Sequence, residues 1–475
     1  MRRAYRASST VDDERVLDIL SLTSDLVKDR LLSFTRFIVD ERKPPMATWE
    51  EAHWQADIAS GIPRAEQRSG TYSRYVPDRL DGVGLAIDGP LSRKVASIER
   101  GIRALNGPGA EGLAGISRFL VRSEAIASSR IEGIAPSAQQ VALAELGQSE
   151  NLRGVTEQAR LVANNMTVVR QATSALAAAE TLTVDHLVAL HRSLLPNEPQ
   201  HHGLRTVQNW IGTSSWSPVG AGYVPPAPEQ VNSLMADLVD YINGAAHSPL
   251  IQAAVVHAQF ETIHPFTDGN GRVGRALIHT VLSRRGLTDR AVLPISLVLA
   301  TLRERYIDGL TAFRHSSPTG SAAASAAVNS WVEVFLESAA IAIEESERLI
   351  AAIETLRTRW IRRLTTHRTG VGLRPAPRAD SAVARLLQQL PEAPVVTPAT
   401  LTRILDITPP AAGAALDELR QAGILTTRSM DRGAKAYLAR EVLDLVTLSE
   451  RTLASTQFDT RVSPPIRPVP ARPQE

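Results

Sequence analysis

The sequence predicts a mainly α fold, in which a helical core with one short β-hairpin precedes a smaller C-terminal module of helices and strands. First, hydrophobic residues make up 43% of the 475 residues but aromatic residues only 4%, as in alanine-rich packed helices. Second, Val273, Leu277 and Val281 recur at helical spacing, in a helix that we expect to end at Gly286. Third, helical character extends over a long stretch, about residues 323 to 364. A chain of this length is expected to form two or three domains.

Clusters of proline, glycine and charge divide the chain into six segments. Residues 1–45 contain one amphipathic helix, at about 12 to 41, and are either an added arm or a mis-assigned translation start. The other segments are a helical lead region at 46–150 that is rich in turns up to residue 90, a helical core at 151–345, a long helix with an arginine-rich linker at 346–378, a compact module at 379–448 and a proline-rich, disordered tail at 449–475.

The stretch from residue 264 to 275 reads His-Pro-Phe-Thr-Asp-Gly-Asn-Gly-Arg-Val-Gly-Arg and contains most of the chemical information. Gly269 and Gly271 allow backbone angles that other residues resist, so that their N–H groups can converge on one anion at a helix start. Arg272 and Arg275 are three residues apart and share a helix face. Two guanidinium groups beside an anion hole suit a polyphosphate, because each can bind phosphate oxygens bidentately.

Two further side chains of this stretch indicate a reaction at phosphorus. Asp268 precedes the turn, and a single carboxylate together with phosphate oxygens is how Mg²⁺ is usually held. His264 has an unperturbed pKa that suits a general base near neutral pH. A substrate hydroxyl would give its proton to His264 and attack the phosphate of a nucleotide, while the anion hole stabilises the developing charge.

The same residues resemble the signature of Fic-domain proteins, His-x-Phe-x-(Asp/Glu)-Gly-Asn-Gly-Arg-x-x-Arg, with no departure. The resemblance implies a function for nearly every position of the stretch. In chain order these are the base at His264, a core anchor at Phe266, the Mg²⁺ ligand at Asp268, the α-phosphate hole at Gly269, Asn270 and Gly271, and ligands for the β- and γ-phosphates at Arg272 and Arg275.

The activity implied by the resemblance is transfer of AMP from ATP to a Tyr, Thr or Ser hydroxyl of a target protein, with release of pyrophosphate. The protein itself would be one acceptor. Family branches that transfer other groups alter the Gly-Asn-Gly part, which this chain keeps. Two other functions stay open: a DNA-binding regulator that uses its Fic domain as a nucleotide sensor, and the protein half of a toxin–antitoxin system.

A second segment, residues 123–134, places a glutamate at the end of a helix, where it is either an ordinary solvated side chain or bound to a cation. Ser128 and Glu132 lie four residues apart on one helix face, and Gly133 is expected to end that helix. Glu132 at the negative end of the helix dipole needs a cationic partner. The segment resembles the inhibitory motif of the family, (Ser/Thr)-x-x-x-Glu-(Gly/Asn), in which the glutamate pairs with the second arginine of the signature. The resemblance therefore implies that Glu132 withdraws Arg275 from the γ-phosphate.

A third segment predicts a surface hairpin at residues 205–226. Two β-like runs enclose a loop rich in serine, glycine and proline. The segment resembles the flap of the family, which pairs with the backbone of the target protein and presents its hydroxyl; main-chain pairing would accept varied target sequences. A surface hairpin without a partner is the alternative. The expected flap residues are Val207, Ile211, Gly212, Tyr223 and Val224.

Composition excludes several other functions. The absence of cysteine rules out disulfides, thiolate nucleophiles and cysteine-type zinc sites.

His186, His191 and His257 lie on apolar helices and are expected to be ordinary core residues rather than catalytic ones. Basic and acidic residues nearly balance, at 52 against 50, so bulk charge predicts no partner. No signal peptide or membrane span is recognisable, so we expect a cytoplasmic protein without membrane contact. A homodimer is a separate possibility.

The C-terminal module resembles a winged-helix domain. Thr397-Pro398 and Thr408-Pro409 predict helix starts, with helices at about 398–405 and 409–422 and strands at 424–428 and 435–438. The helix at 409–422 would be the recognition helix, and Arg420 on it could contact DNA bases. Asp417 and Glu418 on the same helix would repel the phosphates of DNA. The basic residues of the wing are better placed for DNA. Weak DNA contact and protein interaction remain equally open. The wing residues concerned are Arg428, Arg432 and Lys435.

Overall fold

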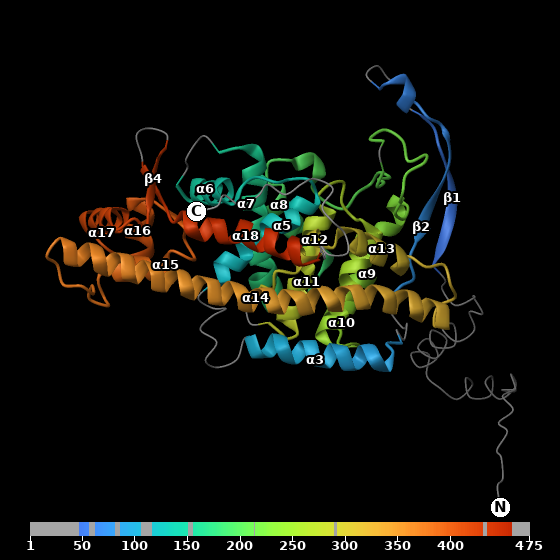
Figure 1. Ribbon diagram of the computed structural model, residues 1–475. Coiled ribbons are helices and arrows are strands. Elements are labelled where there is room, and N and C mark those ends of the chain that lie inside the picture. Colours follow the sequence, from blue (N-terminus) through green and yellow to red (C-terminus); the bar gives the residue numbers. More distant parts are fainter. Residues whose placement is uncertain are drawn as a thin grey trace, which may run out of the picture. The chain divides into compact units, whose positions relative to one another are not determined.

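The computed structural model describes residues 47–56, 62–80, 86–105, 116–150, 155–212, 214–288, 292–430 and 435–457. These residues form one compact unit that is mainly helical, as predicted (Figure 1). The amphipathic helix expected at 12–41, Arg432 of the wing and the proline-rich segment near the C-terminus lie outside the described residues.

A two-stranded antiparallel sheet opens the described chain and corrects the expectation of turns up to residue 90. Strand β1 (Thr48–Trp54) pairs with β2 (Gly70–Val76), and exposure alternates along both strands. Glu50 lies opposite Arg74 in the register, and their side chains form an ion pair at 2.9 Å. Exposure alternates here although residue type does not, since the adjacent Glu50 and Glu51 lie on opposite faces, so the composition concealed a period-two pattern.

Three helices then form the lead region, as predicted: α3 (Gly89–Leu105), α5 (Ser117–Ile131) and α6 (Ala138–Glu150). Helix α5 is buried on all sides from Phe119 to Ser129, including its polar residues. Glu124 of this helix accepts hydrogen bonds from His279 and from the backbone N–H of Ser296, each at about 3 Å. Helix α5 is therefore held in the centre of the molecule rather than on its surface.

The helical core surrounds two successive helices, α10 (Pro249–Ile263) and α11 (Asn270–Arg284). Every residue of α10 after Pro249 is buried, which explains why it lacks an amphipathic pattern. The rest of the core packs around this pair. Its other elements are α7 (Glu157–Gln171) with a π-helical turn η2 (Ala172–Leu176), α8 (Val184–Leu194), the short turn η3 (Pro199–His201), α9 (Pro228–Asn243), α12 (Ile295–Thr301) and α13 (Arg303–Phe313), whereas the turn η1 (Arg64–Glu66) lies between β1 and β2.

Helix α14 (Ala322–Gly370) joins the core to the C-terminal module and is the longest element (Figure 1). Its Ser321 N-cap accepts a hydrogen bond from the backbone of Ala324, and its buried stripe includes Trp331 and Trp360. By length and hydropathy alone α14 is the one described helix that could span a membrane, although 44% of its apolar window is buried inside the protein. Core helices pass the same test, so this finding is weak evidence for a membrane.

The arginine-rich segment predicted as a linker is helical up to Gly370, which corrects that boundary. Arg368 pairs with Glu418 at 2.5 Å, and Arg363 pairs with Glu441. Both of these acidic partners come from the C-terminal module, whereas Arg357 pairs with Glu354 of α14 itself at 2.6 Å. Part of the positive charge of the segment is therefore used in packing against the module, which the local sequence does not reveal.

The C-terminal module has helices and strands at the predicted positions. Helix α15 (Ala382–Gln389) is followed by β3 (Val395–Val396), α16 (Pro398–Leu405), α17 (Pro409–Gln421), β4 (Thr426–Ser429) and β5 (Lys435–Leu438). The strands pair in the order β3-β5-β4, so the sheet has one strand more than expected. The side chain of Thr397 caps α16, whereas Thr408 makes no such bond to α17.

Helix α18 (Arg440–Gln457) corrects the boundary predicted at residue 448. It continues past that point and contacts α6, α12 and α14 of the preceding regions. Leu443, Val446 and Leu453 on it are buried. Arg130 at the end of α5 pairs with Glu450 of α18 at 2.5 Å. The C-terminal region is thus packed against the core instead of being a separate appendage.

Candidate active site

The turn between α10 and α11 positions the signature residues. His264 ends α10 in the left-handed conformation, at φ 50° and ψ 60°, which is unusual for a residue other than glycine. Gly269 precedes α11 at φ 76°, and an added Cβ there would lie 2.7 Å from Leu194 Cδ2. Phe266 is fully buried between them. The turn is therefore anchored at its centre and bent at both ends.

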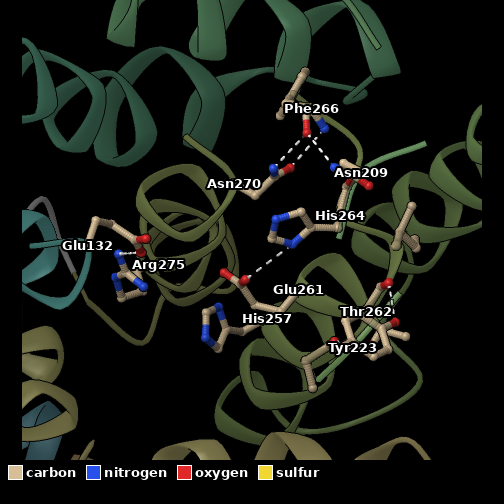
Figure 2. A network of polar contacts seen from close by, with 12 residues as sticks. Glu132, Asn209, Tyr223, His257, Glu261, Thr262, His264, Phe266, Asn270 and Arg275 are labelled. Atoms are coloured by element: carbon tan, nitrogen blue, oxygen red, sulfur yellow. Dashed lines mark hydrogen bonds and ion pairs between the residues drawn. The ribbon is translucent and has the colours of Figure 1, made fainter. Parts of the chain in front are cut away.

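Side chains from distant segments hold the backbone of this turn (Figure 2). Asn270 donates to Phe266 O and accepts from Phe266 N, both at 2.8 Å, and Asn209 donates to Phe266 O at 2.9 Å. Arg205 donates to His264 O at 2.9 Å. The sequence analysis did not predict that Arg205 and Asn209 support the turn. Their position at the start of the hairpin segment is the sequence feature that could have indicated it.

His191 also supports the turn, as a core residue and not as a ligand. Its Nε2 donates to Asp268 O at 2.9 Å, and its ring stacks on Phe266 with centroids 3.9 Å apart. Burial lowers the pKa of His191 to about 4, so its ring is neutral. His257 is buried against Tyr306, and His186 caps its own helix. The expectation of core positions is therefore confirmed for His191 and His257, which are fully buried, but is wrong for His186, which is exposed at the start of α8.

The start of α11 combines backbone N–H groups with a buried guanidinium. Arg272 is 3% exposed, and its Nη2 donates a hydrogen bond to Asp268 Oδ2 at 3.3 Å. Its Nε–H and Nη1–H have no acceptor among the described residues. Buried donors without acceptors are costly, which makes this position suited to an anion. A phosphate here would meet the helix N-terminus as well.

Arg275 is fully buried and faces α5. Its Nε donates to Ser128 Oγ at 3.0 Å, and its Nη2 donates to Ser128 O at 2.8 Å and to Glu132 Oε1 at 2.6 Å (Figure 2). In the chain Arg275 lies 147 positions after Ser128 and 143 positions after Glu132, and the fold brings these side chains together. The pairing of Arg275 with Glu132 is the one that the sequence resemblance implied. Burial of Glu132 opposes its ionisation, yet Arg275 outweighs this effect and the pKa of Glu132 is lowered.

The carboxylate of Glu132 lies directly above the anion-binding turn. A Cβ added to Gly271 would lie 2.0 Å from Glu132 Oε1 and 2.8 Å from Arg275 Nη1. Glu132 is held there because α5 ends at this residue and Gly133 follows at φ 80°, with Ile134 N donating back to Ser129 O at 3.0 Å. The place where a nucleotide phosphate would approach Gly271 is thus bordered by a negative charge.

His264 faces a carboxylate that the sequence analysis missed. Its Nδ1 lies 4.0 Å from Glu261 Oε2, and neither Nδ1 nor Glu261 Oε1 has a hydrogen-bond partner among the described residues. Burial, assisted by Arg314, lowers the pKa of His264 to about 4, whereas burial raises the pKa of Glu261 to about 7. The three-residue spacing from Glu261 to His264 was the available signal.

Asp268 is half-exposed beside Arg272. Within the described ranges no group of three His, Asp or Glu side chains could hold a metal by itself. A lone carboxylate fits Mg²⁺ only when phosphate oxygens and water complete an octahedral shell, which is the usual arrangement at nucleotide sites. Asp268 is compatible with that arrangement.

The hairpin segment differs from the expected two strands. A single bridge joins Ile211 to Tyr223, with N···O distances of 2.8 and 3.1 Å, and Gly212 lies against Ala221, where a Cβ would be 3.0 Å away. Val207 and Ile211 are exposed, but Tyr223 and Val224 are buried. Val224 O already accepts from Tyr75 N of β2 at 2.9 Å. The second run is thus covered, and only the first remains open to a partner.

These features define a helical protein in which a glycine-containing turn and a buried arginine open a central helix, next to a partly exposed histidine whose pKa is lowered to about 4. Comparison with known proteins identifies a matching domain within the chain. Residues 181–282 match the Fic/DOC family, a segment that includes the whole turn and the hairpin but neither Glu132 nor the C-terminal module.

Curated relatives match over a similar segment. The chain is 34% identical over 130 residues to protein adenylyltransferase fic-1 of Caenorhabditis briggsae and 31% identical over 132 residues to that of Caenorhabditis elegans. These matches cover 26% and 27% of this chain and 23% of each relative. A probable protein adenylyltransferase of Aquifex aeolicus is 36% identical over 92 residues, 19% of this chain and 26% of that protein. The match thus spans about a quarter of each relative's length.

Solved structures of Fic proteins are similar at lower identity. A Fic family protein from Desulfovibrio desulfuricans aligns with a TM-score of 0.45 at 21% identity, over 74% of this chain and 97% of its own. Fic-1 from C. elegans aligns with a TM-score of 0.44 at 22% identity, over 56% of this chain and 73% of its own.

Proposed function

We propose that this protein is a protein adenylyltransferase that moves AMP from ATP to a hydroxyl group of a target protein. The observation that carries the proposal is the buried Arg272 with two unmet donors, beside a glycine turn and a neutral His264. The family match and the names of its relatives support this chemistry over other uses of an anion site.

In the proposed reaction the hydroxyl oxygen of the target attacks the α-phosphorus of ATP. The hydroxyl proton passes to His264 Nε2, because Nδ1 faces Glu261. A bond forms between the target oxygen and the α-phosphorus, and the bond from that phosphorus to the bridging oxygen breaks, so that pyrophosphate leaves. The N–H groups from Gly269 to Gly271 stabilise the charge on the α-phosphate oxygens.

The remaining phosphates and a metal ion have natural places. Arg272 would bind the β-phosphate with its unmet donors, and Arg275 would bind the γ-phosphate once it is free of Glu132. Mg²⁺ held by Asp268 and phosphate oxygens would supply neutralisation of the polyphosphate charge.

Glu261 is proposed as a positioning residue for the base. When His264 accepts the proton it becomes a cation in a buried site, and an ionised Glu261 at 4.0 Å stabilises that cation. The same carboxylate favours the tautomer that carries hydrogen on Nδ1 and leaves Nε2 free to accept.

The Glu132 contacts support a second proposal, that the protein is inhibited in cis. With Arg275 bound to Glu132 and Ser128, the γ-phosphate lacks its ligand and meets a carboxylate instead. ATP would then bind with its α-phosphate out of line with the incoming hydroxyl. We infer that Ser128, Glu132 and Gly133 together hold the resting, low-activity state.

The target backbone would approach the open run of the hairpin, where Val207 and Ile211 are exposed. Self-modification is the simplest case of such a reaction. For the C-terminal module we propose a protein-interaction role over DNA contact, because Arg420 is paired with Asp417 and Arg368 with Glu418 on the expected recognition helix.

Labelled ATP tests the proposed reaction directly. Purified Glu132→Gly protein incubated with ATP labelled in the adenine ring should become labelled, whereas ATP labelled in the γ-phosphate should leave no label on protein. A γ-label would indicate a kinase, and no label on this variant with either substrate would favour a nucleotide sensor. Mass spectrometry of lysate proteins bearing an added AMP group, with parent and Glu132→Gly enzymes compared, would identify the targets.

A further inference from the structure

A second polar cavity, of about 230 Å³, lies between the lead region and the C-terminal module. Helices α5 and α6 form one wall, and the segment around β3 and α16 forms the other. No residue of the candidate active site contributes to it. The polar residues that line it are Arg118, Arg122, Glu145, Ser149, Thr400 and Arg403.

Arg122 in this wall is as deeply buried as Arg275, with 1% of its surface exposed. Its Nη2 donates to Glu145 Oε2 at 2.9 Å and to Glu392 O at 3.1 Å. Its Nε–H and Nη1–H have no acceptor in the part of the chain that the structure describes. A buried guanidinium with unmet donors indicates a missing anionic partner, as it does at Arg272.

Arg403 contributes a second available guanidinium from the opposite wall. It is exposed and forms no ion pair or hydrogen bond of its side chain with described residues. Arg118 is 40% exposed and donates to Glu145 Oε1 at 2.6 Å through Nη2. Positive groups from both sides therefore converge on one cavity.

The acidic groups near the cavity are already bound. Glu145 accepts from Arg118 and Arg122 and lies 3.8 Å from Arg170. Arg122 and Arg118 outweigh the burial of Glu145 and lower its pKa, so it is ionised. Glu392 accepts from the backbone N–H of Arg118 at 3.0 Å.

Glu150 accepts hydrogen bonds from the hydroxyl groups of Thr397 and Thr400. Among the residues that line the cavity itself, Arg118, Arg122 and Arg403 are basic and Glu145 is acidic, three positive charges against one negative charge. The balance stays positive, and the unmet hydrogen-bond capacity belongs to arginine donors.

We propose that this cavity binds the phosphate group of a small phosphorylated molecule through Arg122 and Arg403, with Arg118 at its edge. A planar guanidinium matches phosphate oxygens bidentately. The cavity is smaller than the roughly 300–1,000 Å³ of pockets for drug-sized ligands, which favours a ligand near the size of phosphate or pyrophosphate. The site lies on α5, the helix that also carries Ser128 and Glu132.

Calorimetric titration with inorganic phosphate tests the site in the full-length protein. The titration is done in an Arg272→Ala background, which removes a proposed phosphate ligand of the candidate active site. We expect saturable binding that Arg403→Ala weakens at least about tenfold, the effect of losing one charge-assisted contact. Arg403 is exposed and unpaired, so this variant should fold normally. Arg428→Ala is the matched control, because Arg428 is an exposed arginine on β4 of the same module.

Two results would overturn the proposal. One is the absence of phosphate binding in the Arg272→Ala background while the parent binds. The other is an equal weakening by Arg403→Ala and Arg428→Ala, which would show a bulk charge effect. Binding of duplex DNA but not of free phosphate, with dependence on Arg403, would likewise reject a small-molecule site in favour of a nucleic-acid surface. None of these results depends on the proposed transfer of AMP.

Discussion

Replacing Glu132 by glycine removes the carboxylate that borders the anion-binding turn. Arg275 Nη2 donates to this carboxylate at 2.6 Å, while its contacts with Ser128, at 3.0 and 2.8 Å, do not depend on it. The substitution therefore frees the side of Arg275 near Gly271 and keeps the arginine close to its place. Since Glu132 ends α5, glycine at this position is compatible with the helix end. We expect faster AMP transfer, most visibly as self-modification.

Two estimates give the size of this gain. A hydrogen bond to a charged group contributes about 1.5–3 kcal/mol, and each 1.4 kcal/mol is tenfold, so the share of molecules with a free Arg275 should rise by roughly 10- to 100-fold. A substrate misplaced by about 1 Å loses roughly 10²-fold in rate, which is of the same order. The Glu132 side chain is 37% exposed, and solvent screening favours the lower part of this range.

The assay is the initial rate of self-labelling from ATP labelled in the adenine ring, with circular dichroism to confirm folding. Glu132→Gln is the matched control: it keeps the shape of the side chain but not its charge, and should give a smaller gain. Arg275→Ala in the Glu132→Gly background should lose the gained activity, because the freed arginine is what the release requires. A folded Glu132→Gly protein with the parent rate would refute the inhibitory role and leave the chemistry of the turn untouched.

Four further outcomes are expected. His264→Ala should lower self-labelling by about 10²- to 10⁴-fold and leave ATP affinity nearly unchanged, since the base acts only on the incoming hydroxyl; unchanged labelling would remove it from the mechanism. Asp268→Ala should weaken nucleotide binding in the presence of Mg²⁺ but not in its absence, and an unaltered Mg²⁺ dependence in titrations would contradict the metal role. The rate of transfer by the parent protein should rise with pH through about 7 as Glu261 ionises, because its carboxylate then stabilises protonated His264. Glu261→Gln should flatten this rise and slow transfer about tenfold. A variant with the same pH profile as the parent would argue against a role for Glu261. Deletion of residues 379–475 would be harmless for a separate appendage, but it removes the buried side chains of α18 and should lower the midpoint of thermal unfolding, which an unchanged midpoint would disprove.

The sequence by itself was sufficient wherever the signal is local. The turn from residue 264 to 275 needs glycine at Gly269 for its left-handed backbone, and the residues around it follow from the chemistry of anions and helix starts. Helix ends marked by Thr397-Pro398 and by Gly133 were also located correctly, because caps act over three or four residues.

Only the tertiary structure decided what depends on partners far along the chain. The arginine-rich segment was interpreted as a linker because its acidic partners, Glu418 and Glu441, belong to a different region. In the sequence Glu261 resembles any other helical glutamate. Only the folded structure places it beside His264 and buries it, and this burial raises its pKa. Tyr223 and Val224 were expected on an open hairpin, yet packing against β2 and α10 covers them. Burial and charge pairing arise from the whole packed chain, so no local pattern of residues specifies them.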